Sequence, residues 1–594
     1  MPRFDKKMMR RLAKARFSYR SIMRESRLLL IIAAGIAGFL GGTIAALMAA
    51  LTQYLHEILL GVEVNTRLSS STILDPKRTF IVLISGGLIL GLSTWLWRWW
   101  RKTGDIVDPV EANALHGGRM SFRDSTFVMF QSVLSDGVGA SVGLEGGFSQ
   151  GGGAVGSKIG MFIGRRRNDI RMLVGAGAAG AIACAFDSAF AGAAYGFELI
   201  IGSYTVATLA PIATAAICGL FASAVMAAHG YRISMDALPA IQSGNLAWII
   251  LLGVVTALLA VVLMRGVTRV ESFFRASRFP LWSRPMLGGF VVGILALASP
   301  NILASGHGGM EVVMTAPPAI LFLLLILILK LMACAISIGS GFRGGLFSAS
   351  LFLGALTGAA FAKAGIAIGL FTGADVGLYT LVGMAGFAAA VVGAPMTMVA
   401  LAVSITAQLQ ALVPALIGVI AAMLTVRRIF GYSFATWRFH LRGEAILGGQ
   451  DIGWMYKTMA RELMRRGVPV TRNDITIGEF TEQFPLASAR YVIGVDQEQA
   501  YAGLVDVALA HAQSREEGGS DEKIDTIFSH ANAYVTASDP LSQVMPKFER
   551  LKTEILVVVD TEERRSVLGV ISEEYALKMY QQQLEARQKE IFAG

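Results

Sequence analysis

Charged residues are scarce in this chain. Asp, Glu, Lys and Arg make up 16% of its 594 residues, against about 25% in soluble domains. Hydrophobic residues make up 54%, and the mean hydropathy is +0.57. So little charge excludes an ordinary soluble protein over most of the length.

Cysteine and histidine are also rare, with three and seven residues. Cys184, Cys218 and Cys334 lie in apolar runs without disulfide or metal-binding spacing, so we expect them to fill packing space. The histidines show no H-x-x-x-H spacing, and no nucleophile stands in a recognisable arrangement with a base. A membrane enzyme is therefore the weakest functional class for this chain, and we expect no metal site.

Long apolar runs are abundant instead. About 20 apolar residues cross the hydrocarbon core of a bilayer, so runs near that length predict a polytopic helical membrane protein. The alternating segments of roughly 10 residues that typify an outer-membrane barrel are absent from the sequence. The runs are Leu28–Leu51, Phe80–Trp97, Val206–Ala228, Trp248–Met264, Ala319–Ile336 and Leu378–Val403.

The net charge of +10 is concentrated before the first run, in residues 1–27. Basic residues directly before a spanning segment follow the positive-inside rule, which predicts a cytoplasmic N-terminus. The same placement argues against nucleic acid as the partner. The apolar run that follows is too long for the core of a signal peptide.

One carboxylate stands among glycines between apolar runs, in Ser141–Gln150 (SVGLEGGFSQ). A carboxylate at membrane depth costs roughly 2.5–3.5 kcal/mol or more, so Glu145 marks a functional site by default. Glycines before a helical run leave backbone N–H groups free to attract an anion. The stretch predicts an anion site at which Glu145 competes with the anion. A glycine-rich bend whose glutamate faces water is the alternative.

A second glycine-rich break, Gly339–Ser350 (GSGFRGGLFSAS), follows in the other half of the apolar region. Glycine-interrupted segments at corresponding places in two halves indicate a transporter site at a repeat interface.

Gly175, Gly177 and Gly180 have the G-x-G-x-x-G spacing, with Glu198 18 residues further on. A dinucleotide fold needs a preceding strand and a soluble βαβ unit, whereas an arginine-rich turn and more apolar sequence flank this motif. We expect the small residues to let membrane helices approach closely.

The composition changes near Glu444, where charge rises and apolar runs shorten. Tyr491–Val495 and Ile555–Val559 are predicted strands, and each precedes a second short strand, at Gly503–Val505 and Gly569–Ile571. The pattern predicts a soluble α/β domain with a twofold internal repeat, joined by the charged linker Ser514–Lys523.

Over nearly its whole length the chain resembles the CLC family of chloride channels and chloride/proton exchangers. GLEGG at Gly143–Gly147 resembles the family's G-x-E-G-P motif, and GGLFSAS at Gly344–Ser350 resembles G-x-F-x-P. Ala185–Ile200 resembles the segment AFxAPxAGxLFxxE. The C-terminal pair resembles CBS domains.

The resemblance implies a homodimer with one anion pathway per subunit, built from two inverted halves whose helix N-termini meet at the anion. It implies that Glu145 is the gate: the carboxylate fills the outer anion site and leaves it when protonated. The other residues that it implies at the anion pathway are Gly143, Gly146, Gly345, Leu346, Phe347, Ile106, Tyr432 and Ala435.

Several of these positions depart from the family pattern. Ile106 stands where the family has an anion-contacting serine, and we expect the neighbouring Asp105 and Asp108 to point to solvent or to Arg101 and Lys102. The family's central tyrosine falls on Ala435, and a shift of register would place Tyr432 there.

The inner proton glutamate of the exchangers falls on Leu199, as in channel-type members of the family. Glu198, directly before it, is either a proton relay or a structural acid with a local partner. In the CBS-like pair, Leu509 and Tyr575 replace the aspartate that holds a ribose. The resemblance therefore allows adenine nucleotide as a ligand of the pair, but these two residues do not support its binding. We expect that the protein requires no cofactor.

The sequence thus predicts an all-α polytopic membrane domain of two inverted repeats of broken helices, followed by a soluble α/β CBS-like pair. Its predicted divisions are a basic cytoplasmic segment (1–27), a transport domain (28–443) and two CBS-like units (444–513 and 524–594). The predicted function is channel-like transport of chloride, or a similar monovalent anion, across a bacterial inner membrane, with both termini cytoplasmic. A chloride/proton antiporter and a non-conducting membrane sensor with a ligand-binding cytoplasmic pair are the alternatives.

Overall fold

A computed structural model describes most of the chain, in two compact units that are treated separately below: Met1–Asp451 and Ile452–Gly594. The described residues are 26–64, 66–71, 74–101, 106–226, 238, 245–372, 375–431, 433–434, 437, 458–516, 519–551, 553–576 and 578–579.

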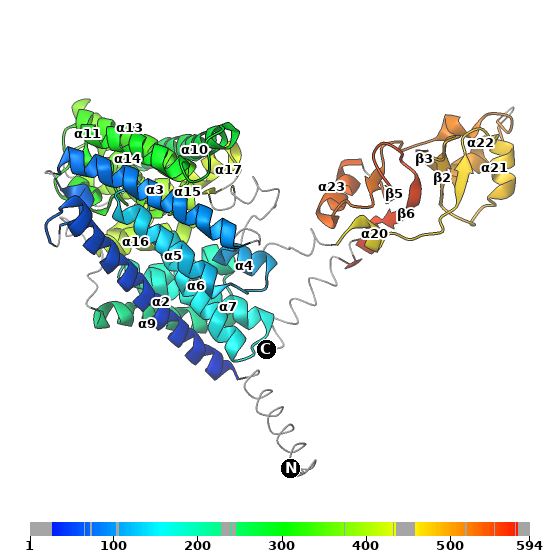
Figure 1. Ribbon diagram of the computed structural model, residues 1–594. Coiled ribbons are helices and arrows are strands. Elements are labelled where there is room, and N and C mark those ends of the chain that lie inside the picture. The colour runs from blue at the N-terminus through cyan, green and yellow to red at the C-terminus, as the bar shows by residue number, and fades with distance from the viewer. Residues whose placement is uncertain are drawn as a thin grey trace, which may run out of the picture. The chain divides into compact units, whose positions relative to one another are not determined.

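The first unit consists of helices that pack side by side (Figure 1). Its first half contains α2 (Arg27–Leu55), η1 (His56–Leu60), η2 (Leu68–Ser70), α3 (Pro76–Trp100), α4 (Pro109–Leu115), α5 (Phe122–Gly137), α6 (Glu145–Phe162), α7 (Arg167–Ala185), α8 (Ala189–Tyr195), η3 (Gly196–Ile201) and α9 (Val206–Val225). Its second half contains α10 (Leu246–Ala276), α11 (Arg284–Ala298), η5 (Pro300–Ile302), α12 (His307–Thr315), α13 (Ile320–Ser340), α14 (Phe347–Ala367), α15 (Asp375–Val392), α16 (Pro395–Thr406), η6 (Leu409–Ala411) and α17 (Leu412–Ile429).

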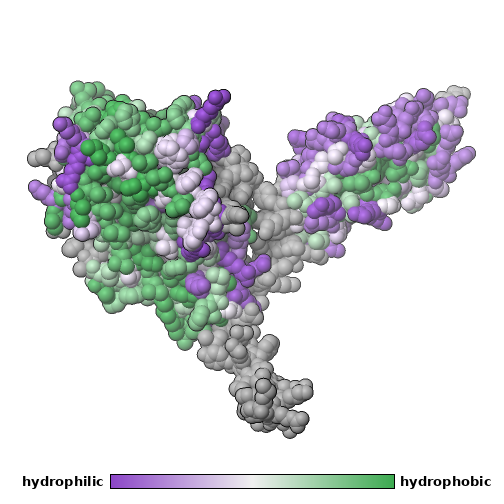
Figure 2. Space-filling view, viewed as in Figure 1, coloured by the Kyte–Doolittle hydropathy of each residue, from purple (hydrophilic) through white to green (hydrophobic). Residues whose placement is uncertain are grey.

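Within the described residues, seven helices are long and apolar enough to cross a bilayer. Large apolar side chains stay exposed along them, such as Leu47 on α2 and Ile328 on α13. Figure 2 shows this unit with a broad hydrophobic surface, whereas the surface of the second unit is largely hydrophilic. The polytopic helical architecture predicted from the apolar runs is confirmed.

One predicted spanning run is wrong in detail. Leu378–Val403 forms two helices, α15 and α16, rather than one. The break lies at Gly393, whose φ of +82° favours glycine, and Pro395 then occupies the first turn of α16. The hydropathy of the run continues across the break, so the apolar pattern alone did not reveal it.

The glycines of the G-x-G-x-x-G motif lie on α7, where they allow close packing of helices. A side chain at Gly177 would collide with the Gly152 carbonyl on α6, and one at Gly180 would collide with Gly38 on α2. A side chain at Gly175 would meet Ile201 at 2.7 Å. The prediction that these small residues let helices approach is confirmed.

The second unit contains two three-stranded sheets of identical topology, β1-β2-β3 and β4-β5-β6. In each sheet the first pair is parallel and the second antiparallel, with a register shift at the same place. The strands are β1 (Val470–Arg472), β2 (Tyr491–Val495), β3 (Tyr501–Asp506), β4 (Tyr534–Thr536), β5 (Ile555–Val559) and β6 (Val567–Ser572). The helices are α20 (Ala460–Leu463), α21 (Ile477–Gln483), α22 (Val507–Gln513), η7 (Ile524–Ile527) and α23 (Leu541–Leu551).

The two repeats of this unit are intertwined. Ser529, ahead of β4, pairs with Leu504 on β3, and Arg465, ahead of β1, pairs with Val570 on β6. Each repeat thus donates the segment before its first strand to the sheet of the other. The predicted strands and the twofold repeat are confirmed, while the short strands β1 and β4 were not predicted.

Candidate functional site

The two glycine-rich stretches lie side by side in the structure. Gly143 and Gly345 form an antiparallel bridge in which each N–H donates to the other carbonyl at 2.9 Å. Helix α6 begins two residues after Gly143, at Glu145, and α14 begins two residues after Gly345, at Phe347. The bridge therefore places the N-termini of two helices, one from each half of the membrane unit, next to each other.

Backbone nitrogens of both helices lie beside the same small space. The position that a Cβ of residue 345 would occupy lies 3.6 Å from the nitrogen of Gly146 and 3.8 Å from that of Phe347. The first N–H groups of a helix have no intrahelical acceptor and carry the positive end of its dipole. Two such ends at one point make a place that favours a monovalent anion.

The carboxylate of Glu145 borders that space. Its Oε2 lies 4.0 Å from the same Cβ position of residue 345, and the side chain is only 2% exposed. Oε1 accepts a hydrogen bond from the Ser348 hydroxyl, on the first turn of α14. Within the described residues, Oε2 has no hydrogen-bond partner. The carboxylate thus stands where two helix ends would otherwise attract an external anion.

Glycine is required at 143 for this placement. The Glu145 side chain folds back over Gly143, so that a Cβ there would collide with Oε2. The structure brings together six of the residues predicted at the anion pathway. They are Gly143, Glu145, Gly146, Gly345, Leu346 and Phe347.

Two further buried titratable residues, on α13 and α5, are connected to Glu145 through the second of them. Lys330 is fully buried, and its Nζ donates to the carbonyl oxygens of Ile302 at 2.9 Å and Ala304 at 2.7 Å. Asp136 is 3% exposed and lies within electrostatic reach of both Lys330 and Glu145. Sequence reasoning missed both residues, although a lysine in the middle of the run Ala319–Ile336 is a signal of function or pairing.

Aromatic side chains surround Phe347. Its ring centroid lies 5.2 Å from that of Phe186 and 6.1 Å from that of Tyr195. Tyr195 is buried, and its hydroxyl hydrogen-bonds the side chain of Ser149, one turn into α6. Sequence reasoning did not select Tyr195. Its place in the Ala185–Ile200 motif, within reach of α6, was the available signal.

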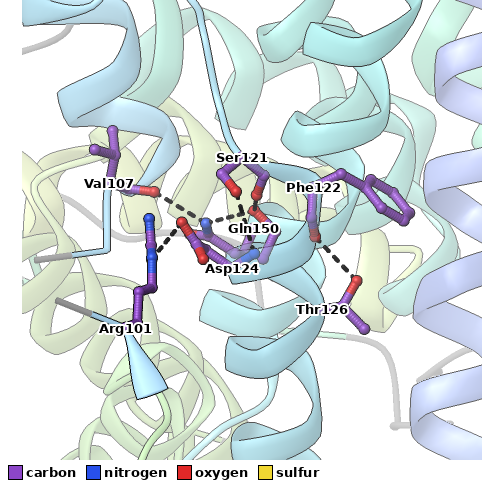
Figure 3. Close-up of polar contacts among 8 residues, drawn as sticks. Arg101, Val107, Ser121, Phe122, Asp124, Thr126 and Gln150 are labelled. Atoms are coloured by element: carbon purple, nitrogen blue, oxygen red, sulfur yellow. Dashed lines mark hydrogen bonds and ion pairs between the residues drawn. The ribbon is translucent and has the colours of Figure 1, made fainter. Parts of the chain in front are cut away.

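The segment around Ile106 is attached to α6 one turn beyond Glu145. Gln150 Nε2 donates to the Val107 carbonyl at 3.0 Å and to the Ser125 hydroxyl at 2.9 Å (Figure 3). Ile106 itself is partly buried next to Val107. The described contacts therefore hold this segment against α6 without placing Ile106 at the helix ends.

Asp108 has a local role that was not predicted. Its carboxylate accepts a hydrogen bond from the Glu111 N–H at 2.9 Å and caps α4. Arg101 pairs instead with Asp124 on α5, as Figure 3 shows. A capping aspartate before Pro109 fits the start of a helix better than a solvent-facing loop. Lys102, Asp105, Tyr432 and Ala435 lie outside the described residues.

Glu198 lies at the N-terminus of α16, which the break at Gly393 creates. Its carboxylate accepts bonds from the backbone N–H groups of Met396 and Thr397, both at 2.8 Å, and from the Thr397 hydroxyl at 2.7 Å. These three donors attach the Glu198 side chain to the start of α16. The geometry favours the structural acid over the proton relay.

The residues at the expected nucleotide position of the C-terminal unit are exposed. Leu509 and Tyr575 are 52% and 45% exposed. The ring of Phe528 lies against Gly494 and Gly503, so that a Cβ on Gly494 would collide with it. An aromatic side chain thus fills the surface of the first sheet.

Known proteins match this chain mainly over the membrane unit. The family model described as voltage gated chloride channel matches residues 86–427, more than half of the chain. A ClcB-like chloride channel protein of Ralstonia nicotianae is 29% identical over 350 residues, covering 58% of this chain and 81% of that protein. The ClC-type chloride channel ClcB of Escherichia coli is 26% identical over 375 residues, covering 61% and 87%.

Solved structures share the fold. A slow cyanobacterial Cl⁻/H⁺ antiporter superposes with a TM-score of 0.62 at 20% identity, covering 70% of this chain and 98% of the other. A eukaryotic CLC transporter gives a TM-score of 0.55 at 19% identity and covers 92% of this chain and 98% of the other. The family match covers more than half of the chain, and the fold agrees with it. The chain therefore belongs to the voltage-gated chloride channel (CLC) family of integral membrane anion transport proteins, which are not enzymes.

Proposed function

We propose that this protein conducts chloride, or a similar small monovalent anion, along a pathway that Glu145 gates. The observation that carries the proposal is the meeting of two helix N-termini at a space bordered by the Glu145 carboxylate. An ionised carboxylate there competes with chloride for the same amides. A protonated one has no charge to hold it, so it leaves the space to the anion.

The pathway is channel-like in this proposal, because Leu199 stands at the inner proton position and cannot carry a proton. Glu198, the alternative relay, is engaged by three donors at the start of α16. These contacts anchor the carboxylate to α16, which fits a structural role better than a relay.

Chloride/proton exchange is the second candidate, and Tyr195 is the observation that favours it. Its buried hydroxyl bonds Ser149 and lies within electrostatic reach of both Glu145 and Asp108. A hydroxyl between the gate and the α4 segment offers one step of a proton route that bypasses Leu199.

The proposal also includes the orientation in the membrane and a dimer. Arg165, in the basic turn between α6 and α7, donates to the Ser26 carbonyl at the start of α2 at 2.9 Å. The start of α2 and this basic turn therefore lie at one face. Both follow or contain basic sequence, so the positive-inside rule assigns that face to the cytoplasm. The homodimer rests on family membership.

Flux from liposomes tests the proposal. The protein is reconstituted in chloride-loaded vesicles, valinomycin carries the counter-charge, and chloride and pH are recorded outside. Chloride release without proton movement is the expected result. Proton movement in fixed proportion to chloride would favour the exchanger, and Tyr195→Phe would then be the first variant. Vesicles that retain chloride would contradict both candidates.

A further inference from the structure

A continuous chain of three hydrogen bonds leads away from Glu145. The Ser348 hydroxyl donates to Glu145 Oε1. The same hydroxyl oxygen lies 3.0 Å from Nε2 of His307, the first residue of α12. On the other side of the ring, Nδ1 lies 2.6 Å from the Ser305 hydroxyl.

With Glu145 ionised and the ring neutral, one arrangement of protons satisfies all three bonds. A hydroxyl has a single proton, and Ser348 uses it on Glu145, so Nε2 of His307 must donate to Ser348. Nδ1 is then the acceptor, and Ser305 donates to it. All three donors therefore point the same way, from Ser305 toward the carboxylate.

The chain leads from a buried group toward one face of the membrane unit. Glu145 is 2% exposed, whereas Ser305 is partly exposed. The segment around Ser305 is bonded to Ser69, in the loop between α2 and α3. The Asn301 side chain donates to the Ser69 carbonyl at 2.8 Å, and the Gly309 N–H donates to the Ser69 hydroxyl at 3.1 Å. That loop follows the end of α2, opposite the start of the helix at Arg27.

Two cations act on the ring, and two carboxyl groups lie further along the same cluster. Arg67, beside η2, and Lys330, on α13, act on His307 as cations. Glu145, on α6, reaches the ring through Ser348, and Asp136, on α5, lies near both Lys330 and Glu145. Any test must therefore keep the charge at position 307 unchanged.

We propose that Ser305, His307 and Ser348 form the path along which a proton from the aqueous phase at this face reaches Glu145. Ser348 gives its proton to the carboxylate and takes the Nε2 proton; Nδ1 takes the proton of Ser305, which water replaces. The net change is one proton moved from solution to Glu145, with the imidazole converted from its Nε2–H to its Nδ1–H tautomer. Return of the proton reverses each step and restores the first tautomer.

This inference rests on the proposed gate. The residues of the path determine how fast Glu145 is protonated, and they do not determine whether the protein conducts chloride. In the orientation proposed above, the face is the outer one. The path would then report the outer pH to Glu145 and would do so independently of Glu198 and Leu199 on the other side of the site.

His307→Gln is the sharpest test. Glutamine retains a neutral N–H donor and an acceptor but cannot pass a proton through itself. Chloride release from liposomes is followed after a rapid drop in outer pH. The onset of release should slow by on the order of a hundredfold, the low end of the contribution of a positioned acid or base. The final rate at acid pH should equal that of the wild type.

Ser305→Ala is the second variant. It removes the entry point at a partly exposed residue and should slow the onset in the same way, even where His307→Gln fails to fold. Ser350→Ala is the matched control, because this buried serine on α14 bonds only the Phe347 carbonyl in the described contacts, at 2.7 Å. Its onset should be that of the wild type.

The same variants in a Glu145→Gln background separate the two proposals. If Glu145→Gln leaves flux and its pH dependence unchanged, the gate itself is refuted. A second outcome refutes the proton path alone. In it, Glu145→Gln frees the flux, but His307→Gln and Ser305→Ala, each with Glu145 intact, respond to the pH drop at the wild-type rate. A lower flux in His307→Gln at every pH, also in the Glu145→Gln background, would show a structural role and overturn the path as well.

Discussion

Gly143 and Gly345 are joined by two backbone hydrogen bonds of 2.9 Å, across 202 positions of sequence and between the two halves of the membrane unit. This bridge fixes the starts of α6 and α14 against each other. It leaves room for the Glu145 carboxylate only because Gly143 carries no side chain. Substitutions around the bridge therefore test the gate directly.

Gly143→Ala should displace the gate. Its new Cβ would collide with Glu145 Oε2, and the backbone of residue 143 is not in the left-handed region, so the side chain rather than the fold has to move. Chloride flux at neutral pH should rise several-fold and depend less on pH. Liposome efflux measures both. Gly266→Ala on α10, where the new Cβ meets only Ala335 at 3.4 Å, should leave the flux unchanged.

Lys330→Met should destabilise the membrane unit. The substitution leaves the carbonyls of Ile302 and Ala304 without their buried donor and Asp136 without a nearby cation. Leaving a buried acceptor without its donor costs about 1–3 kcal/mol. The apparent unfolding temperature in detergent should fall clearly.

Two further variants check the origin of that loss. Adding Asp136→Asn should restore part of the stability, since it removes the charge left uncompensated. Lys158→Met, at an exposed position of α6, should have little effect. Equal losses in Lys158→Met and Lys330→Met would mean that burial of Lys330 is not the cause.

Glu198→Gln should weaken the start of α16 without changing ion coupling. The amide lacks the charge that attracts two backbone N–H groups and the Thr397 hydroxyl, and a helix cap contributes about 1 kcal/mol. A modest fall in the unfolding temperature, with wild-type chloride and proton fluxes, is the expected outcome. Loss of proton movement at unchanged stability would instead identify Glu198 as a relay.

Gly494→Val should destabilise the C-terminal unit. The new side chain would strike the ring of Phe528, which lies against β2 and β3, and overpacking typically costs about 1–3 kcal/mol. Limited proteolysis of the full chain should cut this unit faster. The double variant Gly494→Val, Phe528→Ala makes room for the valine and should slow cleavage again; a double variant cut as fast as the single one would refute the steric cause.

The sequence indicated much of this structure, because local patterns carry it. Bilayer-length apolar runs indicated the helices, and strand-length apolar runs with a repeat indicated β2 and β5. The two glycine-rich stretches and Glu145 indicated the site, because a lone carboxylate and orphan helix N–H groups are unusual at membrane depth.

Other features depend on distant contacts. The break before α16 lies within continuous apolar sequence, and only the packing of Glu198 onto Met396 and Thr397 shows its use. The link from Glu145 through Ser348 to His307 joins residues 203 and 41 positions apart. No periodicity of the chain connects such residues.

The most direct test of the account is the pH dependence of chloride efflux from liposomes that contain wild-type protein or Glu145→Gln. The ionised carboxylate competes with the anion and the protonated one does not, so wild-type efflux should rise as the outer pH falls. Glu145→Gln mimics the protonated gate and should be fast at every pH. Parallel pH profiles in the two proteins would contradict the account.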